Sequence, residues 1–495
     1  MDNLFYIIIT VAYLLIMVII SLFLRKQANK SMDDYGIASN KFGTPVIALV
    51  SMGAWVGSAG LVGLSTSGYV DGVMGYWEYA MAFICIFPWV FIFVPRIKIL
   101  NLYTIPDFFK LRYPKFDGFI QYPTGFFFLI RNATVLGMQL NALAFMFSSF
   151  FGWSHLFGVG ISAVIIALYV SISGLMSVMV TNFIQSIFQT AAPFIAFVFV
   201  IYAAGGWNEI TTYYANHDIS KNLSLFNGTE WIGNLIYYIF TVGLFYAISD
   251  QSDWQRVAAA KDTKTATKSM IIGAALVVPL LIIPCYVGAG ARVVLGDNAD
   301  PNLVFYDLIQ IAGPIVGSLL IIGVMSTILS CCSSYLFAGG MNISHDIIVP
   351  FLKHKGRVVD DKKEIFYSRI GIVLCCLTSI LFAARIEGLI SLWSAGLSIC
   401  AAGLVVPYLF AWFSKRGNTE SAIASMFLAG GTAFVWTMLG NPFGIDAIWI
   451  GLPISLLCCY IVPFFTERPT KEEISQTYYY NEKFKKNTKN NKEVL

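Results

Sequence analysis

The chain has 495 residues, of which 57% are hydrophobic and only 12% are charged, and its mean hydropathy is +0.71. Soluble domains carry roughly twice that charged fraction, so the composition excludes a soluble globule and predicts an all-α protein that spans a lipid bilayer many times. The formal net charge of +4 is small for so long a chain, and it gives no support to nucleic-acid binding.

Apolar runs long enough to cross roughly 30 Å of hydrocarbon follow one another along the chain. The first is read as a retained span, because no basic residue precedes it and no small-residue cleavage site follows it. We expect about thirteen spans, near residues 4–23, 46–68, 75–95, 122–148, 154–174, 178–203, 231–249, 269–290, 311–344, 367–384, 389–413, 420–439 and 445–465.

Lysine and arginine concentrate in alternate loops. The basic loops lie near residues 25–41, 96–115, 256–268, 353–363 and 415–416, and beyond Arg468. Because basic loops stay on the cytoplasmic side, we expect the N-terminus outside and the C-terminus inside a plasma or inner membrane. The sequence thus predicts one transmembrane domain over residues 1–469 and a polar cytoplasmic tail over 470–495.

The residues that support catalysis in other proteins show no catalytic spacing here. The nine cysteines form no CxxC pair, and the four histidines are scattered. No HExxH, Walker loop or nucleophile elbow occurs. We therefore do not expect an enzyme, and the only metal we expect is a transported ion.

Small residues interrupt the second span between Ser51 and Gly60, where three glycines and two serines occur in mid-membrane. One interpretation is an unwound helix whose freed carbonyls coordinate an ion. The other is close packing of neighbouring helices against small residues. The segment alone does not decide between them.

Hydroxyl side chains form a stripe in the span near residues 311–344. They recur at Ser326, Thr327, Ser330 and Ser334, on one helical face. Such a stripe can supply neutral oxygens to a dehydrated cation, or each hydroxyl can bond to the preceding turn's carbonyl.

Two ionisable side chains, Glu78 and Arg131, lie well inside predicted spans. A charge at this depth costs at least ~2.5–3.5 kcal/mol, so each needs a partner or a function. They can pair with each other, or one can reach an interface. Alternatively, Arg131 binds a substrate carboxylate through its planar fork and Glu78 receives a polar or cationic group.

Several segments together resemble the sodium:solute symporter family. The matching motifs are Tyr103-Thr-Ile-Pro-Asp107, Leu111-Arg-Tyr-Pro114, Thr181-Asn-Phe-Ile-Gln185, Asp250-Gln251, Gln255-Arg256, Ala260-Lys261, His345-Asp346-Ile347 and Lys415-Arg416-Gly-Asn418. The resemblance implies a leucine-transporter-type fold with two inverted five-helix repeats, near residues 45–204 and 231–414. One helix precedes these repeats and two follow them.

The resemblance also implies a sodium site. Its backbone ligands fall on Gly53 and Val56, or on Ala54 and Gly57 if the alignment slips by one residue. Its side-chain pair falls on Ser330 and Cys331, although a thiol is a weak ligand for a hard cation and Thr327 could contribute instead. A second ion site of some members matches Ser333, Ser334 and Asn182. Because that position is an amide here and not an aspartate, we expect one coupling ion.

For the solute, the resemblance places Trp55, Glu78, Arg131 and Tyr246 around a midplane pocket. We therefore expect sodium-coupled symport of a small organic solute that bears a carboxylate, with no obligatory protein partner besides the lipid bilayer. Two alternatives stay open, namely a proton-coupled symporter of the same fold and a sensor that binds a solute without moving it.

Overall fold

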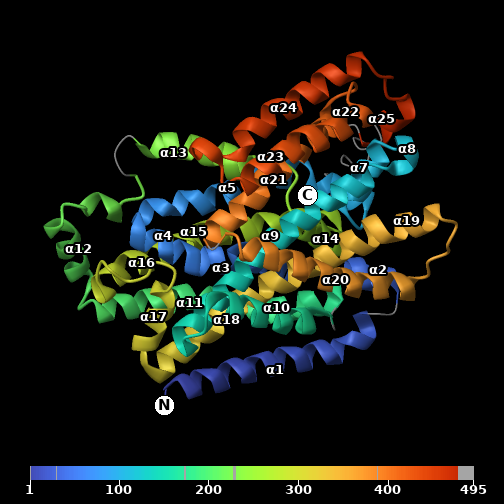
Figure 1. Cartoon of the computed structure of the whole chain (residues 1–495). Helices are drawn as coiled ribbons and strands as arrows, with labels where there is room; N and C mark the ends of the chain where they lie inside the picture. Colours follow the sequence, from blue (N-terminus) through green and yellow to red (C-terminus); the bar gives the residue numbers. More distant parts are fainter. Residues whose placement is uncertain (1, 29–30, 172–173, 227–229, 387, 478–495) are drawn as a thin grey trace.

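The computed structural model describes residues 2–28, 31–171, 174–226, 230–386 and 388–477. These residues form a helical bundle, and within them the only β-pairing is an isolated bridge between Phe42 and Ala260 (Figure 1). In this described part of the chain, eleven helices are long and apolar enough to cross a membrane, and a pair bent by 45°, Trp231–Ala247 and Gln251–Ala259, makes a twelfth if it is one span. A shorter apolar helix covers His155–Leu168. Every predicted span therefore corresponds to an apolar helix, which confirms the all-α membrane fold. The predicted number of about thirteen spans is approximate.

The long apolar helices carry most of the chain. They are α1 (Asp2–Ala28), α3 (Thr44–Ser58) with α4 (Leu64–Val70), α5 (Tyr76–Ile92), α9 (Gln121–Phe151), α10 (His155–Ser171), α11 (Leu175–Ala203), α13 (Glu230–Tyr238), α15 (Thr263–Leu280) with α16 (Ile282–Leu295), α18 (Gly313–Met341), α20 (Asp361–Ala383), α21 (Leu389–Phe413), α22 (Thr419–Ala424) with α23 (Gly431–Met438), and α24 (Ala447–Ile461). The connecting helices are α2 (Met32–Ile37), α6 (Val94–Leu100), α7 (Ile105–Arg112), α8 (Lys115–Gly118), α12 (Trp207–Asn216), α14 (Gln251–Ala259), α17 (Val304–Ile311), α19 (Val349–His354) and α25 (Lys471–Thr477).

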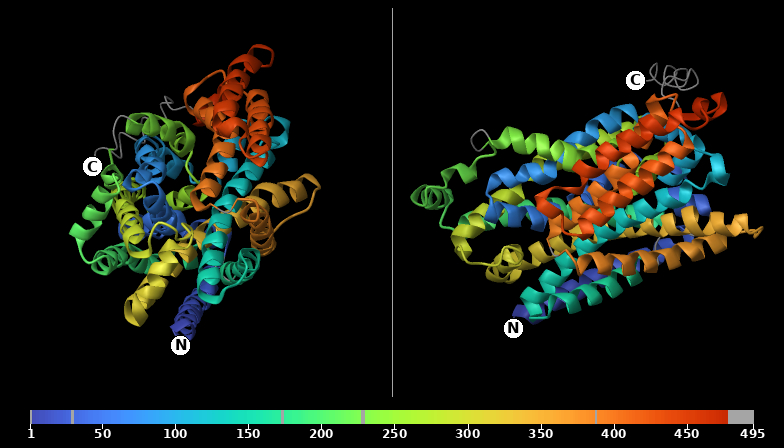
Figure 2. Two further views of the ribbon diagram at one scale, coloured as in Figure 1. Left: turned by 60° about the vertical axis from the view of Figure 1, so that its left-hand side comes forward. Right: turned by 45° about the horizontal axis from the view of Figure 1, so that its top comes forward.

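Burial separates a central group of helices from a peripheral one. In the most apolar windows of the spans Thr44–Val70 and Leu389–Phe413, 89% of residues are buried, against 17% for Phe5–Leu24 and 33% for Ala447–Phe464. A helix that exposes apolar side chains on most of its surface faces lipid. Accordingly α1 runs along the outside of the bundle (Figure 2). The first and last helices are thus peripheral, as the predicted extra helices outside the two repeats should be.

The basic loops gather at one end of the bundle, where α2, α8, α19 and α25 lie (Figure 1). The backbone N–H of Met32 donates to Asp361 (3.0 Å), and Lys115 pairs with Glu420 (3.0 Å). The start of α1 lies at the opposite end, where the Tyr6 hydroxyl donates to the Gly313 carbonyl (3.2 Å). The start of α1 and the basic loops thus lie at opposite ends of the bundle, while the side of the membrane that each terminus faces stays a prediction. The predicted tail lies outside the described residues, except for its first part, which contains α25.

Candidate functional site

The second span breaks at Gly57. Its backbone has φ 50° and ψ −175°, in the region where glycine is favoured, and a wide turn (η2, Ala59–Gly63) follows before α4 begins. The freed backbone is paired with protein groups. The Tyr79 hydroxyl on α5 donates to the carbonyls of Trp55 (2.8 Å) and Val56 (3.2 Å). The sequence segment therefore does form an unwound helix, and its ion-binding role stays a prediction.

Gln139 on α9 bridges the far side of this break. Its amide oxygen accepts the backbone N–H of Ser58 (3.1 Å), and its amide nitrogen donates to the Cys331 sulfur (3.1 Å). Cys331 thus lies beside Gly57, as the predicted site requires. Its sulfur is already an acceptor in a hydrogen bond, which adds to the weakness of a thiol as a ligand for a hard cation.

The hydroxyl stripe on α18 divides into paired and unpaired groups. Ser326 shares a hydrogen bond with Tyr13 (2.7 Å), and Thr327 donates to the Gly323 carbonyl in its own helix (2.8 Å). The Ser330 hydroxyl is fully buried and has no hydrogen-bond partner in the described part of the chain. It lies 3.4 Å from the point that a Cβ on Gly53 would occupy. The structure therefore brings Ser330 to the helix that breaks.

Asn182 on α11 fills the position predicted for a second ion. Its amide nitrogen donates to the Ser330 carbonyl (3.1 Å) and the Ser334 hydroxyl (2.9 Å), and its oxygen accepts the Ser333 hydroxyl (2.8 Å). The predicted residues of this second position thus meet one another. They are linked by N–H and O–H donors, an arrangement that needs no cation.

Arg131 forms a buried ion pair with Asp250. Its Nε donates to Asp250 Oδ1 (2.8 Å), its Nη2 to Oδ2 (3.2 Å), and its Nη1 to the Trp393 carbonyl (3.1 Å). The Tyr335 hydroxyl also donates to Asp250 (2.7 Å), and both side chains of the pair are fully buried.

The structure therefore contradicts a pair between Arg131 and Glu78. Glu78 lies in the first turn of α5 and is only partly buried, whereas the fully buried Arg131 is paired with Asp250. The reason for the different pairing is topological. The turn before α14 carries Asp250 to the centre of the bundle, a position that residue spacing does not reveal.

Aromatic side chains close the space between the break and this ion pair. The ring of Phe83 lies 5.9 Å from Trp55 and 5.7 Å from Tyr246, and Tyr79 packs against Trp393 (4.6 Å). Trp55 also donates its indole N–H to Asp253 (2.9 Å). Trp55, Arg131 and Tyr246 thus surround one region, and each is at most 1% exposed. Glu78 alone of the four predicted solute contacts takes no part in these contacts.

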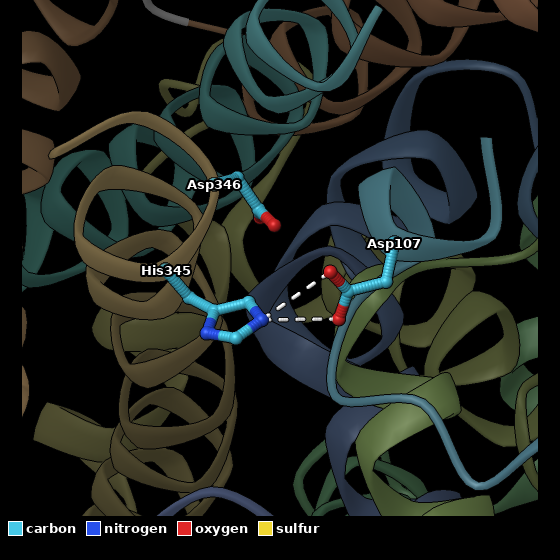
Figure 3. A group of neighbouring side chains, drawn as sticks. All are labelled: Asp107, His345 and Asp346. Atoms are coloured by element: carbon cyan, nitrogen blue, oxygen red, sulfur yellow. Dashed lines mark hydrogen bonds and ion pairs between the residues drawn. The ribbon is translucent and has the colours of Figure 1, made fainter. Parts of the chain in front are cut away.

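A second polar cluster lies at the end of the bundle that carries the basic loops. His345 places Nε2 against Asp107 (3.1 Å) and Nδ1 against Glu364 (2.6 Å) (Figure 3). Asp346 accepts hydrogen bonds from Thr104 (2.6 Å) and Asn342 (2.8 Å). Asp107, His345 and Asp346 lie close enough to hold a metal ion. Each of these three side chains already has a protein partner. The cluster is therefore satisfied as a network of ion pairs and hydrogen bonds that joins α7, η7 (Asn342–Ile348) and α20, and it requires no metal ion.

The fold and the broken helix define a class of protein: a polytopic membrane transporter of the leucine-transporter type. The sequence matches the sodium:solute symporter family over residues 35–430, and the chain belongs to that family. It is therefore a transporter of the plasma membrane and not an enzyme, as predicted.

Known relatives agree with this assignment. A sodium/proline symporter of Staphylococcus aureus is 24% identical over 490 residues, covering 94% of this chain and 93% of that protein. The structure of a Na⁺-coupled sialic acid symporter in a substrate-bound, outward-open state superposes with a TM-score of 0.77 at 16% identity, covering 94% of this chain and 99% of that one. A nucleobase-cation-symport-1 family transporter in a closed conformation gives 0.53 at 12% identity, covering 90% and 97%.

The sequence did not point to three residues that the structure places at the break or the ion pair. Tyr79 and Gln139 bind the freed backbone, and Asp250 holds Arg131. Tyr79 directly follows Glu78, and Asp250 belongs to a motif already noted, so both were near recognised signals. Gln139 gave none, because a lone amide in an apolar helix has many possible partners.

Proposed function

We propose that this protein is a sodium-coupled symporter that imports a small organic solute carrying a carboxylate. The observation that supports this most is the helix break at Gly57, which lies one turn after Gly53, the residue that the unpartnered Ser330 hydroxyl approaches. Unwound backbone beside a hydroxyl-bearing helix is the arrangement in which symporters hold sodium. The relatives named for sodium with proline or sialic acid carry solutes that both bear a carboxylate.

In this proposal sodium binds between α3 and α18. Carbonyls at Gly53 and Val56 and the hydroxyl at Ser330 are its ligands, while Cys331 stays bound to Gln139. The ion would hold the broken helix against α18 and so shape the pocket next to Trp55 and Tyr246. Sodium and solute then favour the same occluded state, and each raises the affinity for the other.

Arg131 is the proposed contact of the solute carboxylate. In the present structure Asp250 occupies one edge of the guanidinium, through Nε and Nη2. The solute must therefore share the guanidinium with Asp250 or displace it. Displacement would leave the buried Asp250 carboxylate without its countercharge, so this proposal takes the guanidinium as shared between Asp250 and the solute carboxylate. Glu78 remains a proposed contact for a polar group of the solute.

The test is a survey of transport currents in liposomes that contain the purified protein. Amino acids, sugars, sialic acids, vitamins and carboxylates are applied in sodium and then in choline. We expect a carboxylated solute to accumulate in the liposomes in sodium alone, with a current if the solute is zwitterionic and without one if it carries one net negative charge. Currents or uptake that ignore sodium and follow an inward pH gradient would replace this proposal with proton coupling. Ligand binding with neither current nor uptake of the solute would replace it with a sensor.

The Ser330→Ala variant tests the ion site, because it removes one proposed sodium ligand and leaves an apolar side chain at that position of α18. We expect a higher sodium concentration for half-maximal transport. Unchanged sodium dependence in this variant would remove Ser330 from the ion site.

A further inference from the structure

A row of three amides faces the ion site from α11. Asn182, Gln185 and Gln189 are spaced by three and four residues, so they lie on one face of the helix, and all three are fully buried. Asn182 is completely paired with α18. Neither amide atom of Gln185 or Gln189 has a hydrogen-bond partner among the described residues. Buried amides without partners are rare in native proteins and indicate a ligand.

Gln189 reaches the helix that breaks. Its amide nitrogen lies 2.0 Å from the point that a Cβ on Gly53 would occupy, so a larger residue at position 53 would force the end of this side chain to move. The unpartnered Ser330 hydroxyl lies 3.4 Å from the same point. Two unpartnered polar side chains, one from α11 and one from α18, therefore converge on the backbone of α3 one turn before its break at Gly57.

The chemistry of this meeting point favours a monovalent cation. A hard cation requires oxygen ligands, and Cys331 is a thiol bound to Gln139. A half-turn of the terminal torsion exchanges the amide oxygen and nitrogen of Gln189, which brings the oxygen toward Gly53. An amide oxygen is also neutral, as the hydroxyl of Ser330 is, so it adds a ligand without adding charge.

We propose that the amide oxygen of Gln189 is a ligand of the coupling sodium ion, in place of the hydroxyl that Cys331 does not provide. This inference rests on the proposed function, since it names a further residue of the same site. The close approach of Gln189 to Gly53 would then serve ion binding. Sodium would contact α11 as well as α3 and α18.

The test measures sodium binding without solute. The melting temperature of the purified protein is followed as NaCl replaces choline chloride, for wild type, Gln189→Met and the control Gln185→Met. Methionine matches the length of glutamine and cannot ligate sodium through oxygen. We expect the half-saturating sodium concentration to rise at least about tenfold in Q189M and to change less than about twofold in Q185M.

A transport assay at saturating sodium distinguishes a loss of sodium binding from a general disturbance of helix packing. There we expect the Q189M variant to keep the wild-type KM for the solute, because only the ion site is altered. If Q189M proves unstable in choline, Gln189→Asn keeps the amide, withdraws it by one methylene, and should weaken sodium binding in the same way.

Wild-type sodium affinity in a folded Q189M or Q189N protein overturns this inference and leaves the proposed function intact. A wild-type protein whose melting temperature and transport both ignore sodium overturns the two together.

Discussion

At the scale of single residues, two buried arginines of this transporter are each balanced by an aspartate of the same chain. Arg131 is paired with Asp250, and Arg256 with Asp253, although all four lie in the interior. Removing one member of a buried pair leaves the other uncompensated and costs about 3–5 kcal/mol. If a solute binds at Arg131 as proposed, it therefore meets a pair that is already neutral, and any net charge it brings must be met by sodium or by rearrangement of that pair.

The role of Arg131 can be separated from its structural pairing with a double substitution. Arg131→Gln alone should destabilise the protein by about 3–5 kcal/mol, because Asp250 remains buried without a partner. Arg131→Gln with Asp250→Asn removes both charges and should recover most of the melting temperature without recovering transport. Transport by the double variant with wild-type affinity for the solute would show that Arg131 does not contact the carboxylate.

The number of sodium ions moved with each solute can be tested by substituting Asn182. Its amide is bonded to Ser330, Ser333 and Ser334. In Asn182→Asp a carboxylate would neutralise a cation at this position. We expect the ratio of charge to solute, measured from reversal potentials in liposomes, to rise in N182D and to stay at the wild-type value in Asn182→Ala. An unchanged ratio in N182D would argue against a second ion position here.

At the scale of elements, the two helices predicted to open the two repeats both deviate from straight geometry in the described part of the chain. α3 breaks at Gly57, and the segment Trp231–Ala247 meets α14 at 45°, where Ser249 has φ 67°. Corresponding breaks in the two halves are characteristic of transporters built from inverted repeats. Both breaks lie next to the aromatic groups that surround the pocket.

Gly57→Ala tests the break itself. Alanine at φ 50° is strained by about 1–3 kcal/mol, and its Cβ would lie 3.2 Å from the Gln139 amide. We expect a lower melting temperature and a weaker response to sodium. Gly160→Ala is the matched control, because Gly160 lies within helix α10 and a Cβ there meets no atom within 4 Å. Equal behaviour of the two variants would contradict a role for the glycine conformation.

The cluster around His345 provides a test that depends on pH. Burial alone would raise the pKa of Asp107, but the ion pair with His345 and the hydrogen bonds from Thr104 hold it below its ordinary value of 3.8. The stability that this carboxylate contributes is therefore present above about pH 4 and is lost as the pH falls through the lowered pKa.

We expect Asp107→Asn to lower the stability at pH 7 by about 1–3 kcal/mol and to reduce the further loss in acid. Melting temperatures from pH 7 to pH 3, with the exposed Asp117→Asn as control, would measure both effects. A D107N protein with the acid profile of wild type would show that the cluster does not join α7 to η7 and α20 energetically.

At the scale of the whole molecule, the positions of the spans could be predicted because apolar length is a direct property of the sequence. The break near Gly57 was one of two interpretations of its glycines and serines, and only the family resemblance favoured it over close helix packing. The partner of Arg131 was not, because Asp250 lies 119 residues further along the chain and reaches it only through the packing of the bundle. Likewise, the free Ser330 and the paired Thr327 look alike in sequence and differ only in their neighbours.

The orientation in the membrane follows from the basic loops and can be measured by labelling. Lys355→Cys and Lys221→Cys lie in exposed segments of opposite predicted sides, and eight of the nine native cysteines are buried, so a Cys85→Ser background is suitable. In intact cells we expect an impermeant maleimide to modify K221C and not K355C. The reverse pattern would invert the predicted topology.

If the amide at Asn182 limits coupling to one sodium ion, as we expect, it also limits how far a solute can be accumulated. A carrier that moves one sodium ion gains ~2.3 kcal/mol from a potential of 100 mV and ~1.4 kcal/mol from a tenfold sodium gradient. For a zwitterionic solute these terms support an inside-to-outside ratio of about 500, and a second ion would square it. For a solute with one net negative charge the potential contributes nothing, and the ratio falls to about ten. The side chain that excludes a second cation would thus make this protein a scavenger of modest power for zwitterions and a weak one for anions.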